Sequence, residues 1–248
     1  LAETRDFPVY LFTGFLESGK TKFIQETLED RRFCNGERTL LLVCEEGEEE
    51  YSPDQFADSC VYIRAVFSKS ELTKENLEAW VKETRAERAV IEYNGMWELA
   101  DLANVLPKSW RVYQIIMLAD ASTFPSYLQN MRQLTVDKLR SAEDVIFNRT
   151  TDSTDRALLH RSVRMVNRRA QMMFEYENGE IAPDDVEDEL PFDMDAEIID
   201  IGDEDYGLWY LDASDKPEKY AGKTIRVTLK YGADKNDKAL SGLKRISK

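Results

Sequence analysis

Short apolar runs alternate with amphipathic stretches along the first two-thirds of the chain. The apolar runs lack polar alternation, which is typical of strands buried on both faces in a parallel sheet. We expect strands at residues 8–13, 39–44, 61–63, 89–91, 112–119, 145–147 and 170–176. Apolar residues at helical spacing predict helices at residues 21–30, 72–85, 124–131, 136–142 and, after a Ser153 N-cap, 154–169.

This order of elements predicts the fold class. Strands that alternate with helices form a mainly parallel sheet with helices on both faces, so we expect an α/β domain. Ligands of such sheets bind at the carboxyl ends of the strands. The unusual polar residues of this chain follow Thr13, Cys44, Ile91, Leu118 and Phe147, each at the end of an expected strand. We therefore expect the ligand site at that edge.

Composition and charge divide the chain further. Its 248 residues are 42% hydrophobic, enough for a substantial core, and its net charge is −15. Every charged residue between 170 and 215 is acidic, whereas most charged residues after 215 are basic. We predict a first domain over residues 1–178, an acidic linker over 179–204 and a small C-terminal segment over 205–248. So acidic a chain is a poor general binder of nucleic acid, and we expect none as a partner.

The sequence also bears on the cellular compartment. No stretch approaches the roughly 18 apolar residues of a membrane-spanning helix, and no basic-then-apolar leader precedes residue 8. The three cysteines form no CxxC pair, which argues against a disulfide framework or a zinc finger. We expect a cytoplasmic protein that does not span a membrane.

Residues 14–21 match the pattern GxxxxGK[ST] of a phosphate-binding loop. Its glycines let backbone N–H groups turn inward around a polyphosphate, and the positive end of the following helix adds to that attraction. Lys20 is expected to reach the β- and γ-phosphates, and the Thr21 hydroxyl to hold Mg²⁺. The expected nucleotide-binding residues of this loop are Gly14, Glu17, Ser18, Gly19, Lys20 and Thr21.

Four segments of the chain are similar to sequence motifs of one known family. Residues 8–21 resemble the opening of the CobW-type P-loop GTPases, which are related to the nickel-inserting GTPases of urease and hydrogenase maturation. Residues 44–48 (CEEGE) resemble the first switch of that family, N-E-x-G-E, and residues 91–95 (IEYNG) resemble its Walker B element, I-E-x-x-G. Residues 148–151 (NRTT) stand at the place of its guanine motif, N-K-x-D. The resemblance spans residues 8–177.

The resemblance implies a P-loop NTPase fold and a GTP-dependent metal chaperone or insertase. Lys20, Glu45 and Glu92 would be catalytic, and Thr21, Glu45 and Glu92 would serve the metal. GTP would be the substrate, Mg²⁺ the cofactor and Zn²⁺ or another transition metal the cargo. Water would attack the γ-phosphate in line, slowly, because no catalytic arginine is identifiable. Hydrolysis would switch the 45–51 loop and gate the release of metal or partner.

Partners and base recognition follow from the same resemblance. A metal-receiving client protein or a permease would be the partner, and residues 205–227 resemble the start of a small OB-like domain of such permeases. Asn148 and Arg149 would bind the base, with Arg149 stacked along it. Thr151 stands where the guanine-accepting Asp is usual, and Asp152 follows one residue later. A preference for guanine over adenine is therefore implied only by the resemblance to the family.

The sequence leaves several interpretations of individual residues and of the function open. The family's C-x-C-C motif is missing, which leaves either a mixed metal site of Glu45 with Cys44 and Cys60, or a solvated acidic loop. Asp120 either supports the metal or caps the next helix. Arg156, His160, Arg164 and Arg168 recur every four residues, and we expect them to form a solvated helix face. Alternative functions are a non-enzymatic nucleotide-sensing adaptor and an ATP-dependent small-molecule kinase.

Overall fold

The computed structural model describes residues 6–187 and 190–229. The chain divides between Val186 and Glu187 into two compact units. Each unit is described by itself below.

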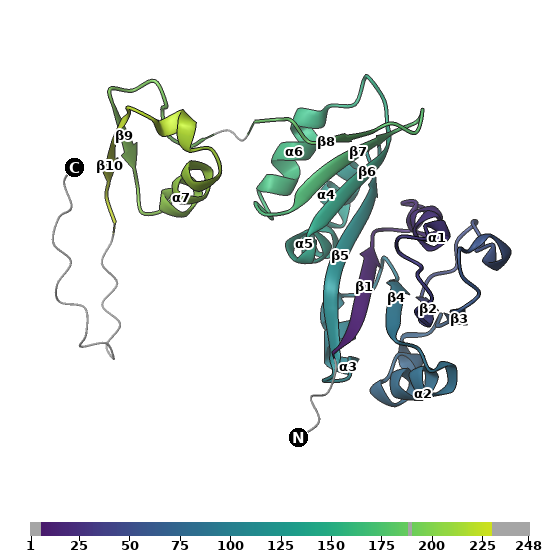
Figure 1. Ribbon diagram of the computed structural model, residues 1–248. Helices are drawn as coiled ribbons and strands as arrows, with labels where there is room; N and C mark the ends of the chain where they lie inside the picture. Colours follow the sequence, from purple (N-terminus) through teal and green to yellow (C-terminus); the bar gives the residue numbers. More distant parts are fainter. Residues whose placement is uncertain (1–5, 188–189, 230–248) are drawn as a thin grey trace, which may run out of the picture. The chain divides into compact units, whose positions relative to one another are not determined.

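An eight-stranded sheet forms the centre of the first unit (Figure 1). Its strands, in spatial order, are β3 (Val61–Ala65), β2 (Thr39–Val43), β4 (Arg88–Glu92), β1 (Phe7–Thr13), β5 (Trp110–Asp120), β6 (Asp144–Thr150), β7 (Gln171–Tyr176) and β8 (Ile181–Pro183). All neighbouring strands are parallel except β7 and β8, which are antiparallel. This confirms the predicted α/β class with a mainly parallel sheet.

Helices cover both faces of the sheet. The helices are α1 (Lys20–Glu29), α2 (Lys74–Thr84), α3 (Leu99–Val105), α4 (Phe124–Asn130), α5 (Arg132–Ser141) and α6 (Arg156–Arg164), with short 3₁₀ turns at Pro53–Gln55 and Lys69–Glu71. Successive strand residues point to opposite faces, and Leu11 and Phe12 accordingly belong to different apolar clusters. The Phe12 cluster includes Ile24 of α1, whereas the Leu11 cluster includes Leu77 of α2.

Strand register brings the expected functional positions to one edge. β1 lies between β4 and β5, and Phe12 is level with Glu92 of β4. On the other side of β1, Asp120 at the end of β5 is level with Asn148 of β6. The segment that follows β1 therefore lies near residues from the ends of three other strands, β4, β5 and β6, as the crevice rule for parallel sheets predicts.

The N-terminus of α6 differs from the expectation. Asp155, not Ser153, is the N-cap, and its side chain accepts a hydrogen bond from the Leu158 N–H. The helix ends at Arg164, earlier than predicted. Ser153 instead takes part in the preceding turn, where its hydroxyl lies 2.9 Å from that of Thr151.

The prediction of a solvated face on α6 is wrong for Arg156, His160 and Arg164, which are buried or partly buried. His160 is only 2% exposed, and its Nδ1 lies 2.6 Å from Asp184 Oδ2. The Arg156 guanidinium lies 4.5 Å from the centre of the Phe174 ring and pairs with Asp185. The acidic segment after β8 folds back over this face and buries it, a contact that no local pattern on the helix reveals.

The second unit is small. It contains β9 (Ile198–Ile201), α7 (Tyr206–Asp215), a 3₁₀ helix at Pro217–Tyr220 and β10 (Thr224–Val227). β9 and β10 form a two-stranded parallel sheet, and Ile199, Ile201 and Tyr220 are buried in a cluster of their own. The predicted order of helix, turn and strand within residues 205–227 is confirmed.

The segment expected as an acidic linker, residues 179–204, contains two strands. β8 within it pairs with β7, and β9 within it pairs with β10. Of the expected C-terminal segment 205–248, residues 230–248 lie outside the described part of the chain.

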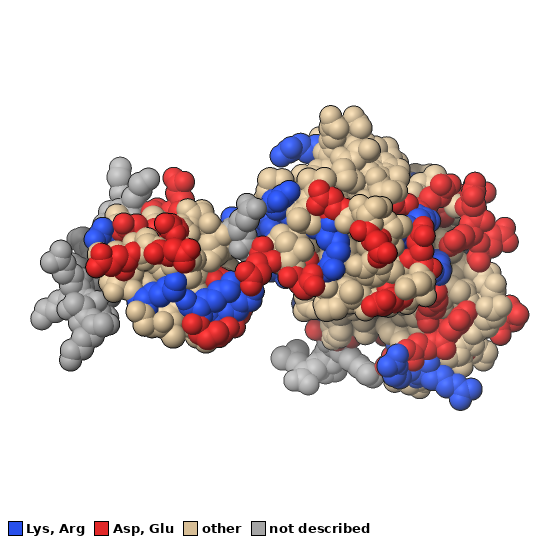
Figure 2. All heavy atoms as spheres, turned by 90° about the horizontal axis from the view of Figure 1, so that it is seen from above, with Lys and Arg blue, Asp and Glu red and all other residues tan. Residues whose placement is uncertain are grey.

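On the face of each unit that Figure 2 shows, acidic side chains are widely distributed and basic side chains are interspersed among them. No helix among the described residues is both long enough and apolar enough to cross a membrane.

Candidate phosphate-binding site

The loop between β1 and α1 requires glycine at two points. Gly14 has φ 140° and Gly19 has φ 85°, both in the region that favours glycine. A Cβ at Gly14 would lie 2.3 Å from the Leu118 carbonyl oxygen, and one at Gly19 would lie 2.4 Å from Asn148 Nδ2. Glu17 also has a positive φ, 60°, which is uncommon for a residue with a side chain and is often found at functional sites.

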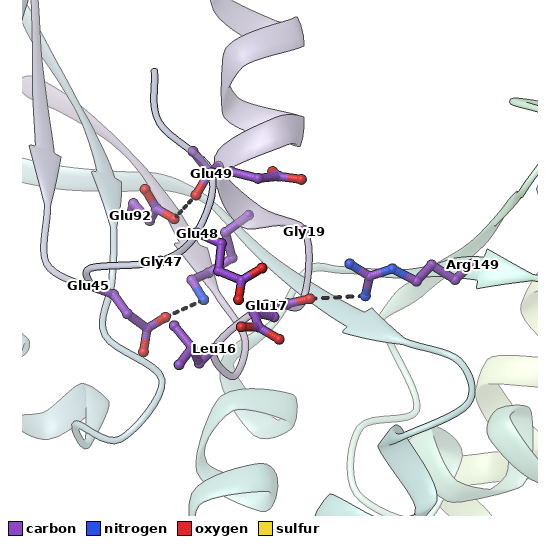
Figure 3. A pocket seen from close by; sticks show the side chains of 11 residues that line it. Leu16, Glu17, Gly19, Glu45, Gly47, Glu48, Glu49, Glu92 and Arg149 are labelled. Atoms are coloured by element: carbon purple, nitrogen blue, oxygen red, sulfur yellow. Dashed lines mark hydrogen bonds and ion pairs between the residues drawn. The ribbon is translucent and has the colours of Figure 1, made fainter. Parts of the chain in front are cut away.

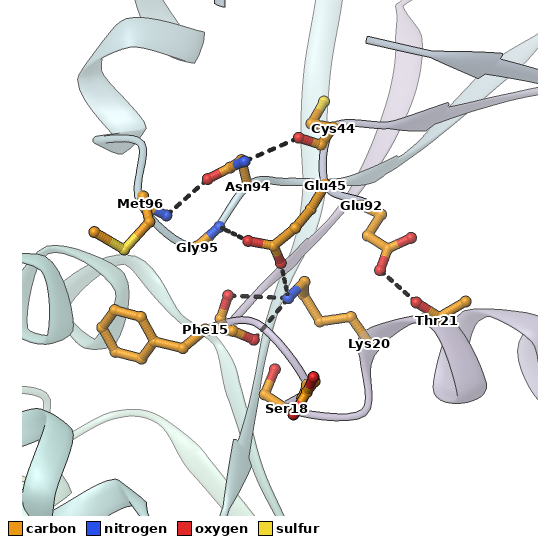
Figure 4. A network of polar contacts seen from close by, with 12 residues as sticks. Phe15, Ser18, Lys20, Thr21, Cys44, Glu45, Glu92, Asn94, Gly95 and Met96 are labelled. Atoms are coloured by element: carbon orange, nitrogen blue, oxygen red, sulfur yellow. Dashed lines mark hydrogen bonds and ion pairs between the residues drawn. The ribbon is translucent and has the colours of Figure 1, made fainter. Parts of the chain in front are cut away.

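Lys20 lies at the centre of the loop. It is 3% exposed, and its Nζ donates hydrogen bonds to the carbonyl oxygens of Gly14 at 3.1 Å and Phe15 at 2.8 Å. Glu45 Oε2 lies 2.6 Å from the same Nζ, while Glu45 Oε1 accepts from the Gly95 N–H at 3.1 Å (Figure 4). One carboxylate thus bridges a lysine amine and a backbone N–H, the kinds of donor that hold a phosphate oxygen.

The turn after β4 packs directly against the loop. A Cβ at Gly95 would lie 2.6 Å from the Gly14 carbonyl oxygen and 2.7 Å from Phe15 Cα, so only glycine fits there. Asn94 Nδ2 donates to the carbonyl oxygen of Cys44 at 3.1 Å. The segments that resemble the first switch and Walker B are therefore in contact with each other and with the loop.

Glu92 is the second carboxylate of the site. Thr21 Oγ1 donates to its Oε1 at 2.7 Å, and the Tyr51 hydroxyl donates to its Oε2 at 2.6 Å. Burial raises the pKa of Glu92, while the hydrogen bonds from Tyr51 and Thr21 favour its charged form. Burial beside this carboxylate also raises the pKa of the Tyr51 phenol, which therefore remains a protonated donor.

Tyr51 is a site residue that the sequence analysis missed. It comes from the 44–57 segment, and the nearest sequence signal is only an aromatic residue after a run of glutamates. Its neighbour Ser52 is tied to α1, because Gln25 Nε2 donates to the Ser52 carbonyl oxygen and the Ser52 N–H donates to Gln25 Oε1. These contacts place the phenol over Glu92.

A cavity of about 130 Å³ opens beside the loop. Lys20 and Thr21 line it, together with Glu17, Glu45, Glu48, Glu49, Glu92 and Arg149 (Figure 3). The hydroxyl of Thr21 and the carboxylate of Glu92 are hard oxygen donors in contact, and this donor pair suits Mg²⁺. Of the three predicted metal residues, Thr21 and Glu92 come together, whereas Glu45 is bound to Lys20.

The mixed sulfur and oxygen metal site is not found among the described residues, where no group of three or more His, Cys, Asp or Glu side chains could hold a metal ion. Cys44 is buried in an apolar cluster, and burial raises its pKa to about 12, which disfavours the thiolate that a metal needs. Glu45 is occupied by Lys20, and Cys60 is a partly exposed thiol.

Asn148 and Arg149 lie on the other side of the loop. Asn148 Nδ2 donates to the Ser18 carbonyl oxygen at 2.7 Å. Arg149, with φ 52°, donates from Nη1 to the Glu17 carbonyl oxygen at 3.0 Å and pairs with Asp120 at 2.8 Å. Both predicted base-binding residues therefore contact the loop itself.

Asp120 contacts the turn that follows β5 and pairs with Arg149. Its Oδ1 accepts from the N–H of Ser122 at 2.8 Å, immediately before α4. Burial opposes ionisation, but hydrogen bonds from Ser122 and Arg149 hold the pKa of Asp120 below its usual value. Asp120 thus holds the turn before α4, but it is not the cap of that helix, because the N-cap of α4 is Thr123.

A comparison with family models gives a match over most of the chain. The family model described as CobW/HypB/UreG, nucleotide-binding domain, matches residues 8–174. The Zn(II)-bound YjiA GTPase from E. coli is 19% identical with a TM-score of 0.52, covering 68% of this chain and 57% of that one. A Zn(II)-bound triple mutant of YjiA is 20% identical with a TM-score of 0.52, covering 72% and 60%. The two structures share the fold, and the chain spans less than two thirds of each.

One curated protein matches over a short stretch. The small ribosomal subunit protein uS8 of Lachnoclostridium phytofermentans is 54% identical over 39 residues. That stretch is 16% of this chain and 29% of uS8. A match of this extent assigns no activity to the chain.

Proposed function

The chain belongs to the CobW/HypB/UreG family of nucleotide-binding domains, and from this premise we propose that it binds GTP with Mg²⁺ and hydrolyses it slowly. Hydrolysis would control the loop that carries Glu45, and through it the handling of a transition-metal cargo such as Zn²⁺. Zn²⁺ is in this proposal a substrate rather than a resident cofactor.

The observation that carries the proposal is the bridge made by Glu45. Its carboxylate lies between Lys20 Nζ and the Gly95 N–H, in a cradle built from the P-loop and the turn after β4. An anion already occupies the position where these donors would hold a terminal phosphate. A bound GTP would displace Glu45 from Lys20, because both anions need the same amine.

Thr21 and Glu92 fit the role of magnesium residues. They are in hydrogen-bond contact at the start of α1 and the end of β4. When bound there with GTP, Mg²⁺ would neutralise charge on the phosphate oxygens. Tyr51 holds the second oxygen of Glu92, and so fixes the direction in which that carboxylate faces.

Slow turnover is expected from the arginine at the cavity. Arg149 lines it, but its guanidinium is held by the Glu17 carbonyl oxygen and by Asp120. An arginine so engaged is not free to stabilise charge that develops on a transferring phosphoryl group. Glu92 and Glu45 would orient the attacking water once Glu45 has left Lys20.

The test is a titration of fluorescent GTP and ATP analogues into the full chain, with and without Mg²⁺ and Zn²⁺, combined with steady-state phosphate release. We expect Mg²⁺-dependent GTP binding that falls at least 100-fold in Lys20→Ala, because the loop loses its only point charge on the phosphates. Lys74→Ala, which removes an ion-paired lysine of α2 away from the site, is the matched control. Wild-type binding and turnover in Lys20→Ala would exclude the proposal.

A non-enzymatic nucleotide sensor is the second candidate function. The absence of a metal-binding group among the described residues favours it, because a sensor needs nucleotide and a partner but no cargo. Nucleotide binding without phosphate release above the Lys20→Ala background, and without a response to Zn²⁺, would select this alternative. A preference for ATP together with transfer of phosphate to an added acceptor would instead indicate a kinase.

A further inference from the structure

Thr151 stands at the position where the guanine-accepting Asp is usual, and its hydroxyl contacts its own turn. Thr151 Oγ1 lies 2.9 Å from the Ser153 hydroxyl and 3.4 Å from that of Thr154, so it is engaged within its own turn. Asp152, one residue later, is exposed. Neither Thr151 nor Asp152 lines the cavity next to Asn148.

That cavity has a volume of about 350 Å³ and lies at the carboxyl ends of β6 and β7. It shares Gly19, Glu49 and Arg149 with the cavity at Lys20 and Thr21. A single elongated ligand can therefore occupy both, with its phosphates at the loop and its base beside Asn148.

Asn148 gives independent evidence of a missing partner. Its residue is 8% exposed, and its Oδ1 is buried with no hydrogen-bond partner among the described residues. Buried polar atoms are nearly always paired in native proteins, directly or through water. Asn148 lines the cavity, so a ligand or a water bound there would supply the partner.

Four glutamates line the cavity: Glu26, Glu49, Glu175 and Glu177. Glu175 lies 3.2 Å from Lys22 Nζ, and Glu26 lies 3.8 Å from the same amine, so both are charge-paired. Glu49 belongs to the acidic loop and also lines the phosphate cavity. Glu177 remains, and within the described part of the chain its carboxylate makes no hydrogen bond or ion pair.

Glu177 is also placed beside the altered motif. It follows directly on β7, and its N–H donates to the Thr150 carbonyl oxygen at 3.3 Å. Thr150 is the residue just before Thr151, where the guanine-accepting Asp is usual. The backbone of Glu177 is thus bonded to the residue before the position from which the family's own carboxylate is missing, and the exposed Glu177 lines the cavity beside Asn148.

We propose that Glu177 is the residue that selects guanine in this protein. Guanine presents two donors on one edge, the N1–H and the 2-amino group, and a carboxylate accepts both at once. Adenine presents an acceptor at N1, which would face the charge unfavourably. The inference rests on the proposed function, in which the nucleotide is GTP.

The test compares GTP, ITP, XTP and ATP binding to the full chain in wild type and in Glu177→Gln. Wild type should prefer GTP, with weaker binding of ITP, which lacks the 2-amino group. Glu177→Gln should bind GTP about 10- to 100-fold more weakly, because two charge-assisted hydrogen bonds are lost. Its amide can donate to the 2-oxo group of xanthine, so XTP binding should rise and the XTP to GTP ratio should increase at least 100-fold.

Two matched variants serve as controls. Asp152→Asn changes the carboxylate that is next in sequence to the usual position, and Glu175→Gln changes a charge-paired carboxylate of β7 in the same cavity. We expect neither to raise the XTP to GTP ratio. If wild type prefers GTP and Glu177→Gln leaves the ratio unchanged, or if Asp152→Asn changes it instead, the assignment of Glu177 is wrong and the proposed function stands. A wild-type chain that does not bind GTP overturns both.

Discussion

Two buried lysines of the first unit have opposite surroundings. Lys20 has a carboxylate 2.6 Å away and donates to two carbonyl oxygens. Lys138, on α5, is 0% exposed, and its Nζ donates to the Trp97 carbonyl oxygen at 3.3 Å and lies 5.4 Å from the centre of the Phe15 ring. Burial lowers the pKa of Lys138 to about 8. Burying the charged form of Lys138 therefore lowers the free energy of unfolding, by an amount that depends on pH.

We predict that the free energy of unfolding of Lys138→Met, taken relative to that of wild type, falls as the pH rises. The pKa of Lys138 is about 8 in the folded state and 10.5 in its usual state. Between those values the unfolded chain binds more protons, so the free energy of unfolding of the wild type rises with pH. Relative to the variant, wild type should gain about 2 kcal/mol between pH 7 and pH 10. Urea denaturation at both pH values measures this, and Lys82→Met, an exposed lysine of α2, should show no such change.

The segment from Cys44 to Ala57 is held to its neighbours at separate points. Glu45 contacts Lys20 and Gly95, Tyr51 contacts Glu92, and the Ala57 N–H donates to the Leu28 carbonyl oxygen at 3.0 Å. Residues 46–50 between the first two attachments are exposed. Breaking the attachment at Glu45 would therefore release the N-terminal part of the loop while Tyr51 and α1 still hold the rest.

Glu45→Gln is expected to bind GTP about tenfold more tightly. The variant keeps the shape of the side chain but removes the charge that competes with phosphate for Lys20, an effect of about 1–2 kcal/mol. Fluorescent GTP titration measures it, and hydrogen exchange over residues 44–50 should become faster in the nucleotide-free chain. Glu48→Gln, in the same cavity, is the control. Weaker GTP binding by Glu45→Gln would mean that Glu45 helps to hold the nucleotide.

At the scale of the whole molecule, the candidate site belongs to one unit. Every residue of the phosphate cavity and of the cavity beside Asn148 lies before residue 187. The three larger apolar clusters are formed within this unit, and the second unit has a separate cluster around Ile199. Residues 1–186 therefore contain both a core and a complete candidate site.

We predict that a chain of residues 1–186 folds cooperatively and binds GTP within about threefold of the full chain, a difference below 1 kcal/mol. Thermal unfolding and the fluorescent GTP titration check the two parts of this prediction. The same truncation carrying Lys20→Ala should not bind. Loss of GTP binding by a folded 1–186 chain would show that the second unit contributes to the site.

Features carried by neighbouring residues were predictable from the sequence. The phosphate loop is one example, because its glycine positions and Lys20 act through local backbone geometry. The buried strands are another, because an apolar run bounded by polar residues reports its own burial. These features were sufficient to predict a mainly parallel α/β domain and the edge at which its site lies.

The tertiary structure decided what depends on contacts between distant segments. Glu45 is close to Lys20, Tyr51 to Glu92 and Glu177 to Thr150 only because the sheet brings those strand ends together. The burial of His160 likewise required the chain after β8 to return over α6. A sequence pattern reports what each residue prefers locally, whereas partners and charges across the site are set by strand order and register.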